Sequence, residues 1–191
     1  MRGHGASAVR DGGGDLPLPL HHRSDELRIL DDLAQRVERV IGVLPDGWAE
    51  QRAAIERYRD SKRAFLPVLA HRDLHDGQFI TTEQDIALLD FDCLCLGEKA
   101  LDVANLIAHL SLRYLQGLSG ATPESAEAAG EALLEGLDRS QERGFIKALR
   151  FYQATTFLRL ALVYELRPRW WHIVPDLVTL SQRCSRDLCR C

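Results

Sequence analysis

The sequence predicts a mainly α-helical (α+β) domain, in which helices dominate and a small β component lies near the middle. Three observations indicate this class. Apolar residues recur at helical spacing over most of the chain, and two short apolar segments flank the polar residues Thr82 to Asp85. Hydrophobic residues make up 46% and charged residues 27% of the 191 residues, which is typical of one globular domain.

The N-terminal residues are expected to form a flexible tail before the first helix. Residues 1–23 contain three consecutive glycines, Gly12 to Gly14, and show no alternating strand pattern. Ser24 is the expected N-cap of a helix whose apolar positions recur from Leu27 to Ile41. We therefore place a flexible tail at residues 1–23 and a folded lobe at residues 24–191.

The remaining elements follow in chain order. A turn at Pro45 to Gly47 precedes a second helix, which is expected from Trp48 to Phe65 and ends before Pro67. The short apolar segments predict a β-hairpin that pairs Phe79 to Thr81 with Ile86 to Leu89. Helical spacing predicts four more helices, at residues 100–116, 123–137, 142–165 and 174–188.

The segment between the second and third helices contains the residues that phosphoryl transfer requires. It reads His71-Arg72-Asp73-Leu74-His75-Asp76-Gly77-Gln78 and, after the hairpin, Leu88-Leu89-Asp90-Phe91-Asp92. In phosphoryl transfer a loop Asp orients the acceptor hydroxyl and accepts its proton, while further side-chain oxygens hold the metal on the phosphates. The spacing assigns these roles to Asp73, Gln78 and Asp90, whose oxygens are the donors that Mg²⁺ prefers.

This segment resembles the aminoglycoside phosphotransferase and choline-kinase-like family, relatives of the protein kinases. His71 to His75 is similar to the family's HGDLH loop, with Arg72 where the family usually has Gly. Leu89 to Asp92, Gly97 and the run from Asp102 to Leu106 are similar to its IDW(E/D)…G…DLA segment. The resemblance implies the helical C-terminal lobe of a protein-kinase-like fold, with short β-hairpins around the catalytic loop.

The resemblance also implies roles for individual residues and names the cofactors. The implied roles are catalytic base for Asp73, metal binding for Asp90, Gln78 and Asp92, and bracing of the loop for His71 and Asp102. Gln78 stands where the family has a metal-binding Asn, so its longer side chain would hold the metal less rigidly. The implied cofactors are ATP and Mg²⁺.

Three further residues are candidate contacts of the acceptor, which in this family is a small hydroxyl-bearing compound such as an aminoglycoside, choline, homoserine or a sugar. Asp76 and Glu165 would favour a cationic acceptor, although charges on helices usually form a solvated face. Trp170 would stack on a sugar or a cation, or else pack the terminal helices against each other. The sequence leaves these alternatives open and does not select one acceptor.

We expect the chain to correspond to the C-terminal lobe alone. A kinase of this fold binds its nucleotide with a preceding lobe that supplies a sheet, a phosphate-covering loop and a lysine. Residues 1–23 contain no lysine, and Gly12 to Gly14 lack flanking strands. The expected function is ATP-dependent O-phosphorylation by the complete protein, with weak or no activity of this chain. The alternatives are a non-catalytic binding or scaffold module and, third, a metal-dependent hydrolase.

Charge and composition narrow the expected partners. The net charge of -4 disfavours nucleic acid as a partner. No apolar run reaches the roughly 18 residues of a membrane span, and no signal peptide is apparent. We therefore expect a cytoplasmic protein with reduced cysteines. Apolar surface that normally faces a missing N-terminal lobe would favour a homodimer.

Overall fold

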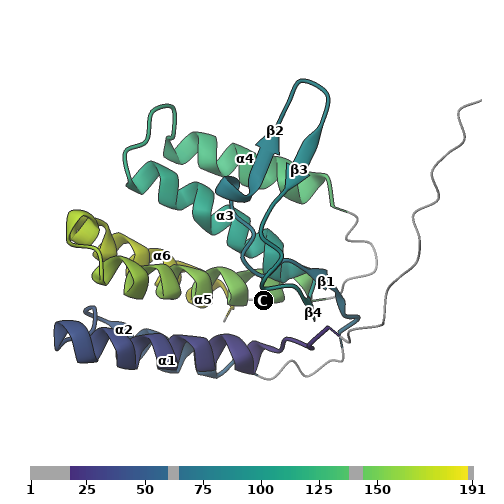
Figure 1. The fold of residues 1–191 in the computed structure, drawn as a ribbon. Coiled ribbons are helices and arrows are strands. Elements are labelled where there is room, and N and C mark those ends of the chain that lie inside the picture. The colour runs from purple at the N-terminus through teal and green to yellow at the C-terminus, as the bar shows by residue number, and fades with distance from the viewer. Residues whose placement is uncertain (1–17, 60–64, 138–143, 189–191) are drawn as a thin grey trace, which may run out of the picture.

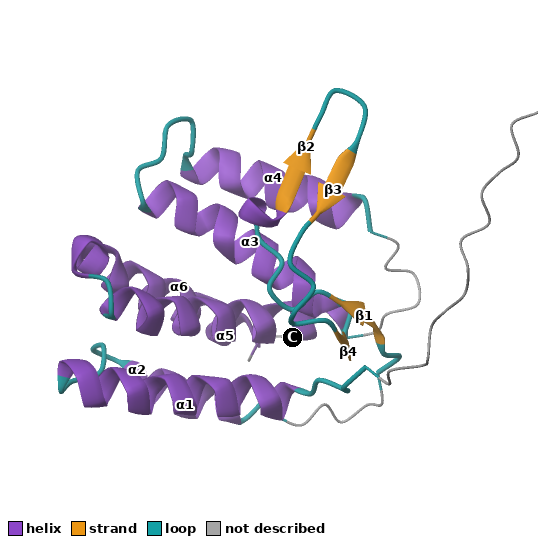
Figure 2. Cartoon of the chain, in the orientation of Figure 1, coloured by secondary structure: helices purple, strands orange, loops and turns teal. Residues whose placement is uncertain are grey.

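The computed structural model describes residues 18–59, 65–137 and 144–188 of the chain. In these ranges helices predominate, and the short strands form two antiparallel two-stranded sheets (Figure 1, Figure 2), which confirms the predicted mainly α-helical class. In chain order the elements are α1 (Arg23–Ile41), α2 (Trp48–Glu56), β1 (Val68–Ala70), the 3₁₀-helix η1 (Asp76–Gln78), β2 (Phe79–Thr81), β3 (Ile86–Leu88), β4 (Cys95–Gly97), α3 (Ala100–Leu115), α4 (Pro123–Glu135), α5 (Phe145–Glu165), the 3₁₀-helix η2 (Pro168–Ile173) and α6 (Val174–Leu188).

The long helix α5 is the centre of the helical core. Every residue from Phe151 to Leu158 is buried, so α5 is covered on all sides, as is typical of a helix whose apolar residues are not confined to one stripe. Its neighbours are α6, α3, α1 and α2. Figure 1 shows α1 and α2 on one side of α5 and α3 on the other. The core thereby supports α3, the helix on which the candidate site is built.

The two small sheets hold the segment that carries the phosphoryl-transfer motif. β1 pairs with β4, with Ala70 opposite Cys95. β2 pairs with β3, with Phe79 opposite Leu88, so the predicted hairpin is confirmed; Figure 2 shows it projecting from the helices. β1 ends where the segment of residues 71–78 begins, and β2 starts where it ends. This segment, which we call the HRD loop, is therefore anchored by a strand at each end.

The folded lobe begins earlier than the sequence predicts. Residues 1–17 of the expected flexible tail lie outside the described residues. Leu20, by contrast, forms a β-bridge with Leu96, and the backbone N–H of His21 donates to the Leu96 carbonyl at 2.8 Å. Leu20 and His21 are therefore part of the lobe and not of a flexible tail, because they bond to Leu96 of β4 just before α1 begins.

The N-cap of α1 is His22 and not the predicted Ser24. The backbone N–H of His22 donates to the carboxylate of Asp25 at 2.8 Å, so the helix begins two positions earlier. The preceding His21 is buried and lies 2.7 Å from the carboxylate of Glu26. Burial by itself would raise the pKa of Glu26, but the hydrogen bond with His21 and nearby arginines hold it below its usual value. A polar pair thus anchors the chain as it enters α1.

The second helix is shorter than predicted. α2 ends at Glu56 and turns follow it, whereas the expected helix extended to Phe65; residues 60–64 lie outside the described residues. Trp48 and Ile55 bury one face of α2. The residues that follow are mostly charged and provide no apolar stripe to bury, so packing no longer stabilises the helix. Helices α3 to α6 agree with the predicted helices to within a few residues at their ends.

A buried ion pair joins the start of α1 to the segment between β4 and α3. Arg23 Nε and Nη2 donate to the two carboxylate oxygens of Glu98 at 2.7 and 2.8 Å. The Tyr152 hydroxyl on α5 donates to the same carboxylate at 3.2 Å. Although burial alone would lower the pKa of Arg23, hydrogen bonding and the charge of Glu98 raise it. This cluster fixes the chain immediately before α3.

Candidate active site

A polar stripe on α3 contacts the HRD loop along its length. The stripe consists of Asp102, Asn105, His109 and Arg113, which share one helix face because they are three or four positions apart. Asp102 binds the backbone N–H groups of His71 and Arg72, and Asn105 binds the Arg72 carbonyl. His109 stacks on the His75 ring, and Arg113 binds the Asp76 carboxylate. Sequence reasoning identified only Asp102 here; the signal for the others was this regular spacing of polar residues on a helix.

Asp102 binds the backbone at the start of the HRD loop. Its carboxylate accepts hydrogen bonds from the backbone N–H groups of His71 and Arg72, both at 2.7 Å. Burial raises the pKa of this carboxyl group, although the two N–H donors lower it in part. The contacts satisfy two N–H groups at the point where the chain leaves β1. Asp102 therefore connects α3 to the first two residues of the HRD loop, which is the position that the predicted bracing role requires.

Arg72 has a left-handed backbone conformation, with φ of 67°, which is unfavourable for a side chain other than Gly or Asn. Asn105 Nδ2 donates to the Arg72 carbonyl. Asn105 Oδ1 in turn accepts from Thr156 Oγ1 at 2.7 Å and from Arg159 Nη2 at 3.0 Å. Asn105 is only 1% exposed. This buried network stabilises an Arg at the glycine position of the related family and fixes the peptide that precedes Asp73.

The His71 ring links the HRD loop to the end of β3. Its Nε2 lies 2.7 Å from the carbonyl oxygen of Leu89 and therefore carries the donated hydrogen. The ring also packs against Phe91, with ring centroids 5.5 Å apart. Its Nδ1 is buried without a hydrogen-bond partner among the described residues. His71 thus connects the loop that carries Asp73 to the segment that carries Asp90.

Gln78 and Asp90 lie on the two sides of the β2–β3 hairpin, just before β2 and just after β3. The backbone N–H of Leu89 donates to the Gln78 carbonyl at 2.9 Å, which places Gln78 beside the segment that leads to Asp90. Asp90 and Asp92 are exposed, whereas Gln78 is buried at 7% exposure. Asp90 has a left-handed backbone with φ of 58°. Asp73 is partly exposed.

The side-chain oxygens of Asp90, Asp92 and Gln78 are of the chemical type that binds Mg²⁺. Carboxylate and amide oxygens are the ligands that Mg²⁺ prefers, and it usually binds through one or two carboxylates together with substrate phosphates. Within the described ranges no three His, Cys, Asp or Glu side chains gather as a metal site. The carboxylates of Asp90 and Asp92 are exposed and are ligands of the type that Mg²⁺ binds, whereas the side chain of Gln78 is buried.

His75 and His109 stack between the HRD loop and α3. Their ring centroids lie 4.9 Å apart with an interplanar angle of 26°. His75 Nδ1 accepts a hydrogen bond from the Gly77 backbone N–H at 3.0 Å. Burial, helped by the charge of Arg159, lowers the pKa of His109 to about 4. His109 is therefore neutral at neutral pH, and its ring supports the loop by packing.

Acid is expected to destabilise the lobe through His109. Its pKa falls from 6.5 to about 4 on folding, so its contribution to stability is complete above pH 6.5 and is lost as the pH falls towards 4. We expect a loss of about 2–3 kcal/mol over this interval. Urea denaturation at several pH values would measure it. His109→Phe keeps the ring stack without a titrating group, so an equal pH dependence in this variant would contradict the assignment.

Asp76 is bound to α3 through Arg113. Arg113 Nε donates to both carboxylate oxygens of Asp76, at 3.0 and 2.8 Å. Arg113 Nη1 donates to Gln116 Oε1 at 3.3 Å, and Gln116 Nε2 donates to the Tyr164 hydroxyl at 2.8 Å. Tyr164 packs edge-on against Trp170, with ring centroids 6.4 Å apart. Two of the predicted acceptor contacts, Asp76 and Trp170, are therefore linked by a chain of side chains.

Glu165 is the last residue of α5, and Trp170 lies in η2. Trp170 packs on α5, in line with the packing alternative for this side chain. The neighbouring Trp171 donates from Nε1 to the Glu165 carbonyl at 2.7 Å. Burial, together with the charge of Asp46, raises the pKa of the Glu165 carboxyl group.

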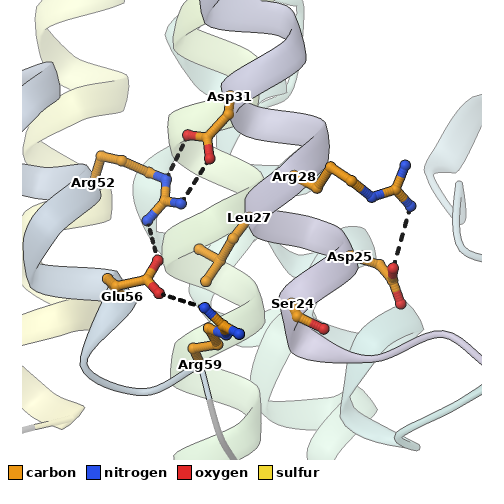
Figure 3. Close-up of a pocket in the computed structure, with 8 residues that line it drawn as sticks. All are labelled: Ser24, Asp25, Leu27, Arg28, Asp31, Arg52, Glu56 and Arg59. Atoms are coloured by element: carbon orange, nitrogen blue, oxygen red, sulfur yellow. Dashed lines mark hydrogen bonds and ion pairs between the residues drawn. The ribbon is translucent and has the colours of Figure 1, made fainter.

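An open surface depression of about 350 Å³ lies between α1 and α2 (Figure 3). Its charged side chains pair with one another: Arg52 donates to Asp31 at 2.7 and 2.8 Å and to Glu56 at 2.6 Å. Hydrogen bonds with Asp31 and Glu56 raise the pKa of Arg52. No predicted site residue lines this depression, so we interpret the ion pairs as a structural connection of α1 to α2. Its lining consists of Ser24, Asp25, Leu27, Arg28, Asp31, Arg52, Glu56 and Arg59.

The fold resembles solved structures of small-molecule kinases. A choline/ethanolamine kinase family protein from Mesorhizobium loti superposes with a TM-score of 0.51 at 14% identity, over 92% of this chain and 56% of that protein. A glucosamine kinase gives a TM-score of 0.53 at 16% identity, over 88% of this chain and 47% of that protein. At these identities the likeness shows the fold alone. The chain spans about half the length of both structures.

Sequence comparison confirms the predicted resemblance. An uncharacterized protein from Deinococcus radiodurans is 31% identical over 106 residues, which make up 53% of this chain and 29% of that protein. The model of the phosphotransferase enzyme family (APH) matches residues 13–145, which include the HRD loop, Asp90 and Asp102. The chain therefore belongs to the phosphotransferase enzyme family.

Proposed function

We propose that this chain is the catalytic and acceptor-binding lobe of an ATP-dependent small-molecule kinase that phosphorylates a hydroxyl group. One observation carries the proposal. Asp102 and the His71 ring hold the HRD loop against α3 and against the end of β3, so the segments of Asp73 and Asp90 are held relative to each other. Phosphoryl transfer depends on such positioning more than on covalent chemistry. Membership of the phosphotransferase family and the kinase-like fold support the same conclusion.

Each residue has a specific task in this proposal. Asp73 orients the acceptor hydroxyl and accepts its proton as the acceptor oxygen bonds to the γ-phosphorus and the bond to ADP breaks. Asp90, Asp92 and the Gln78 amide would hold Mg²⁺, which neutralises charge on the β- and γ-phosphates when it is bound. His71 positions the loop.

We infer that a second lobe, in the same or another polypeptide, holds the nucleotide. None of the strands in the described residues carries a lysine that could reach phosphates. The segments on either side of the HRD loop also carry exposed apolar side chains, and such side chains favour contact with another protein surface, either that lobe or a second copy of this chain. These side chains are Leu66, Leu69, Ile80, Ile86, Leu89 and Phe91.

In the described part of the chain, no helix combines the length and hydropathy of a membrane span.

Asp73→Asn is the substitution that tests the proposed function. We expect the wild-type chain to transfer phosphate from γ-labelled ATP to a mixture of glucosamine, choline and ethanolamine only slowly, because none of the described strands carries a lysine to bind the phosphates. We expect Asp73→Asn to reduce the rate of phosphate transfer by about 100-fold or more, because no carboxylate then accepts the proton of the acceptor hydroxyl. Asp85→Asn, in the exposed hairpin turn, is the matched control. Equal transfer by the wild type and Asp73→Asn would refute the assigned role.

A non-catalytic binding module is the second candidate, and the buried Gln78 at the position of the family's metal-binding Asn is the observation that favours it. Such a module would keep the fold and lose nucleotide chemistry. Calorimetric titration with Mg²⁺-ATP, run beside the transfer assay, separates the two. Binding without Asp73-dependent transfer would favour the module.

A further inference from the structure

The segment that follows β3 contacts the first two residues of the HRD loop at alternate positions. The Leu89 carbonyl lies 2.7 Å from His71 Nε2, and the Phe91 ring packs against the His71 ring with centroids 5.5 Å apart. Arg72 Nη2 donates a hydrogen bond to the sulfur of Cys93 at 3.4 Å. The two residues between these contacts are exposed, and they are the aspartates predicted to bind the metal, Asp90 and Asp92.

Cys93 and Asp92 are the central residues of a turn. The backbone N–H of Leu94 donates to the Phe91 carbonyl at 3.1 Å and closes this turn. The side chain of Arg72 therefore reaches the turn at the residue next to the Asp92 carboxylate. A contact at this position restricts the directions in which Asp92 can point, whereas an exposed turn without such a contact would move freely in solvent.

Arg72 has a conformational cost that a glycine at this position would not have. Its φ of 67° brings the Cβ atom into an unfavourable contact with the backbone, and the related family usually has Gly here. Its half-buried side chain also acts on the interior of the lobe. Burial by itself raises the pKa of Glu26 on α1, and the charges of Arg159 and Arg72 are among those that lower it. A side chain kept at such a cost, and directed at neighbouring segments, indicates a role for its contacts.

We propose that Arg72 is a positioning residue whose side chain holds the turn from Phe91 to Leu94, and with it Asp92, against the HRD loop. His71 holds the residues on either side of Asp90, and Arg72 adds a second connection that a glycine cannot make. The catalytic loop and the segment of the two aspartates then move as one unit. The inference rests on the proposed function, in which Asp92 serves the metal.

Hydrogen exchange of the Leu94 amide, measured by NMR on the full chain without nucleotide, tests this connection. The Leu94 N–H is bonded within the turn, so it exchanges only when the turn opens. Cys93→Ala removes the acceptor of Arg72 and should speed this exchange by about fivefold, while the amides of the buried helix α5 stay unchanged. Arg72→Gly should have a similar effect, and the double variant should add nothing, because both changes remove the same contact.

Cys93→Ser and Arg36→Ala are the matched controls. Cys93→Ser keeps an acceptor for Arg72 and should exchange nearly as slowly as the wild type. Arg36→Ala removes one positive charge from an exposed position on α1 and should leave the Leu94 exchange unchanged. Wild-type exchange of Leu94 in both Cys93→Ala and Arg72→Gly, or effects of the two changes that add fully, would overturn the proposal.

A second measurement separates positioning from a purely structural role. In the phosphotransfer assay Arg72→Gly should raise the Mg²⁺ concentration needed for half-maximal transfer by about tenfold and change the maximal rate less, because a mobile Asp92 holds the metal less well. An unchanged Mg²⁺ dependence would reduce Arg72 to a structural residue and contradict the proposal. Absence of transfer by the wild type would refute the proposed function, whereas the exchange of Leu94 still decides whether Arg72 holds the turn.

Discussion

Replacing Glu98 with alanine is expected to lower the free energy of unfolding by about 3–5 kcal/mol, because the guanidinium of Arg23 stays buried without its counter-charge. The side chains of Arg23 and Glu98 are each 8% exposed, so water cannot replace the missing carboxylate. The Tyr152 hydroxyl also loses its acceptor. A loss of this size is a large share of the stability of a typical domain. Urea denaturation followed by circular dichroism would measure it.

The control for this prediction removes both charges. Arg23→Met combined with Glu98→Leu should be clearly more stable than Glu98→Ala, because apolar side chains of similar size can replace a buried ion pair at little cost. Arg28→Ala, whose side chain is 68% exposed, should change the stability by less than about 0.5 kcal/mol. A Glu98→Ala effect below about 1 kcal/mol would show that the buried pair contributes no more than a surface ion pair.

Replacing Asp102 with alanine is expected to lower the stability of the lobe and to make the HRD loop more mobile. The backbone N–H groups of His71 and Arg72 lose their acceptor, and each unsatisfied group costs about 1–3 kcal/mol. We therefore expect a loss of about 3 kcal/mol for the pair. The left-handed conformation of Arg72 depends on these contacts, so the peptide before Asp73 should become mobile. Urea denaturation and amide hydrogen exchange of the HRD loop would measure the two effects.

Two variants calibrate the Asp102 result. Asp102→Asn keeps one acceptor oxygen and should lie between the wild type and Asp102→Ala. Glu83→Ala, in the exposed turn of the β2–β3 hairpin, should leave the stability and the exchange rates unchanged. If the His71 and Arg72 amides in Asp102→Ala exchange as slowly as in the wild type, the carboxylate does not brace the loop.

Local patterns predicted most of the elements, and errors occurred where a distant partner decides the structure. The β2–β3 hairpin and α6 follow from spacing within short segments, and both are present as predicted. The pairing of Leu20 and His21 with Leu96 leaves no local pattern in the sequence, because it depends on a partner far along the chain. The end of α2 differs from the prediction for a related reason, since Ile55 is the last buried residue of the helix while helical propensity continues beyond it.

By itself the sequence determined the helical class and the phosphotransferase lineage, because the spacing of Asp73, Gln78 and Asp90 is a local property of the chain. Only the tertiary structure decided which polar side chains of α3 face the HRD loop. A polar residue on an amphipathic helix looks the same in sequence whether it meets solvent or another segment. The pairing of Arg113 with Asp76 is such a case.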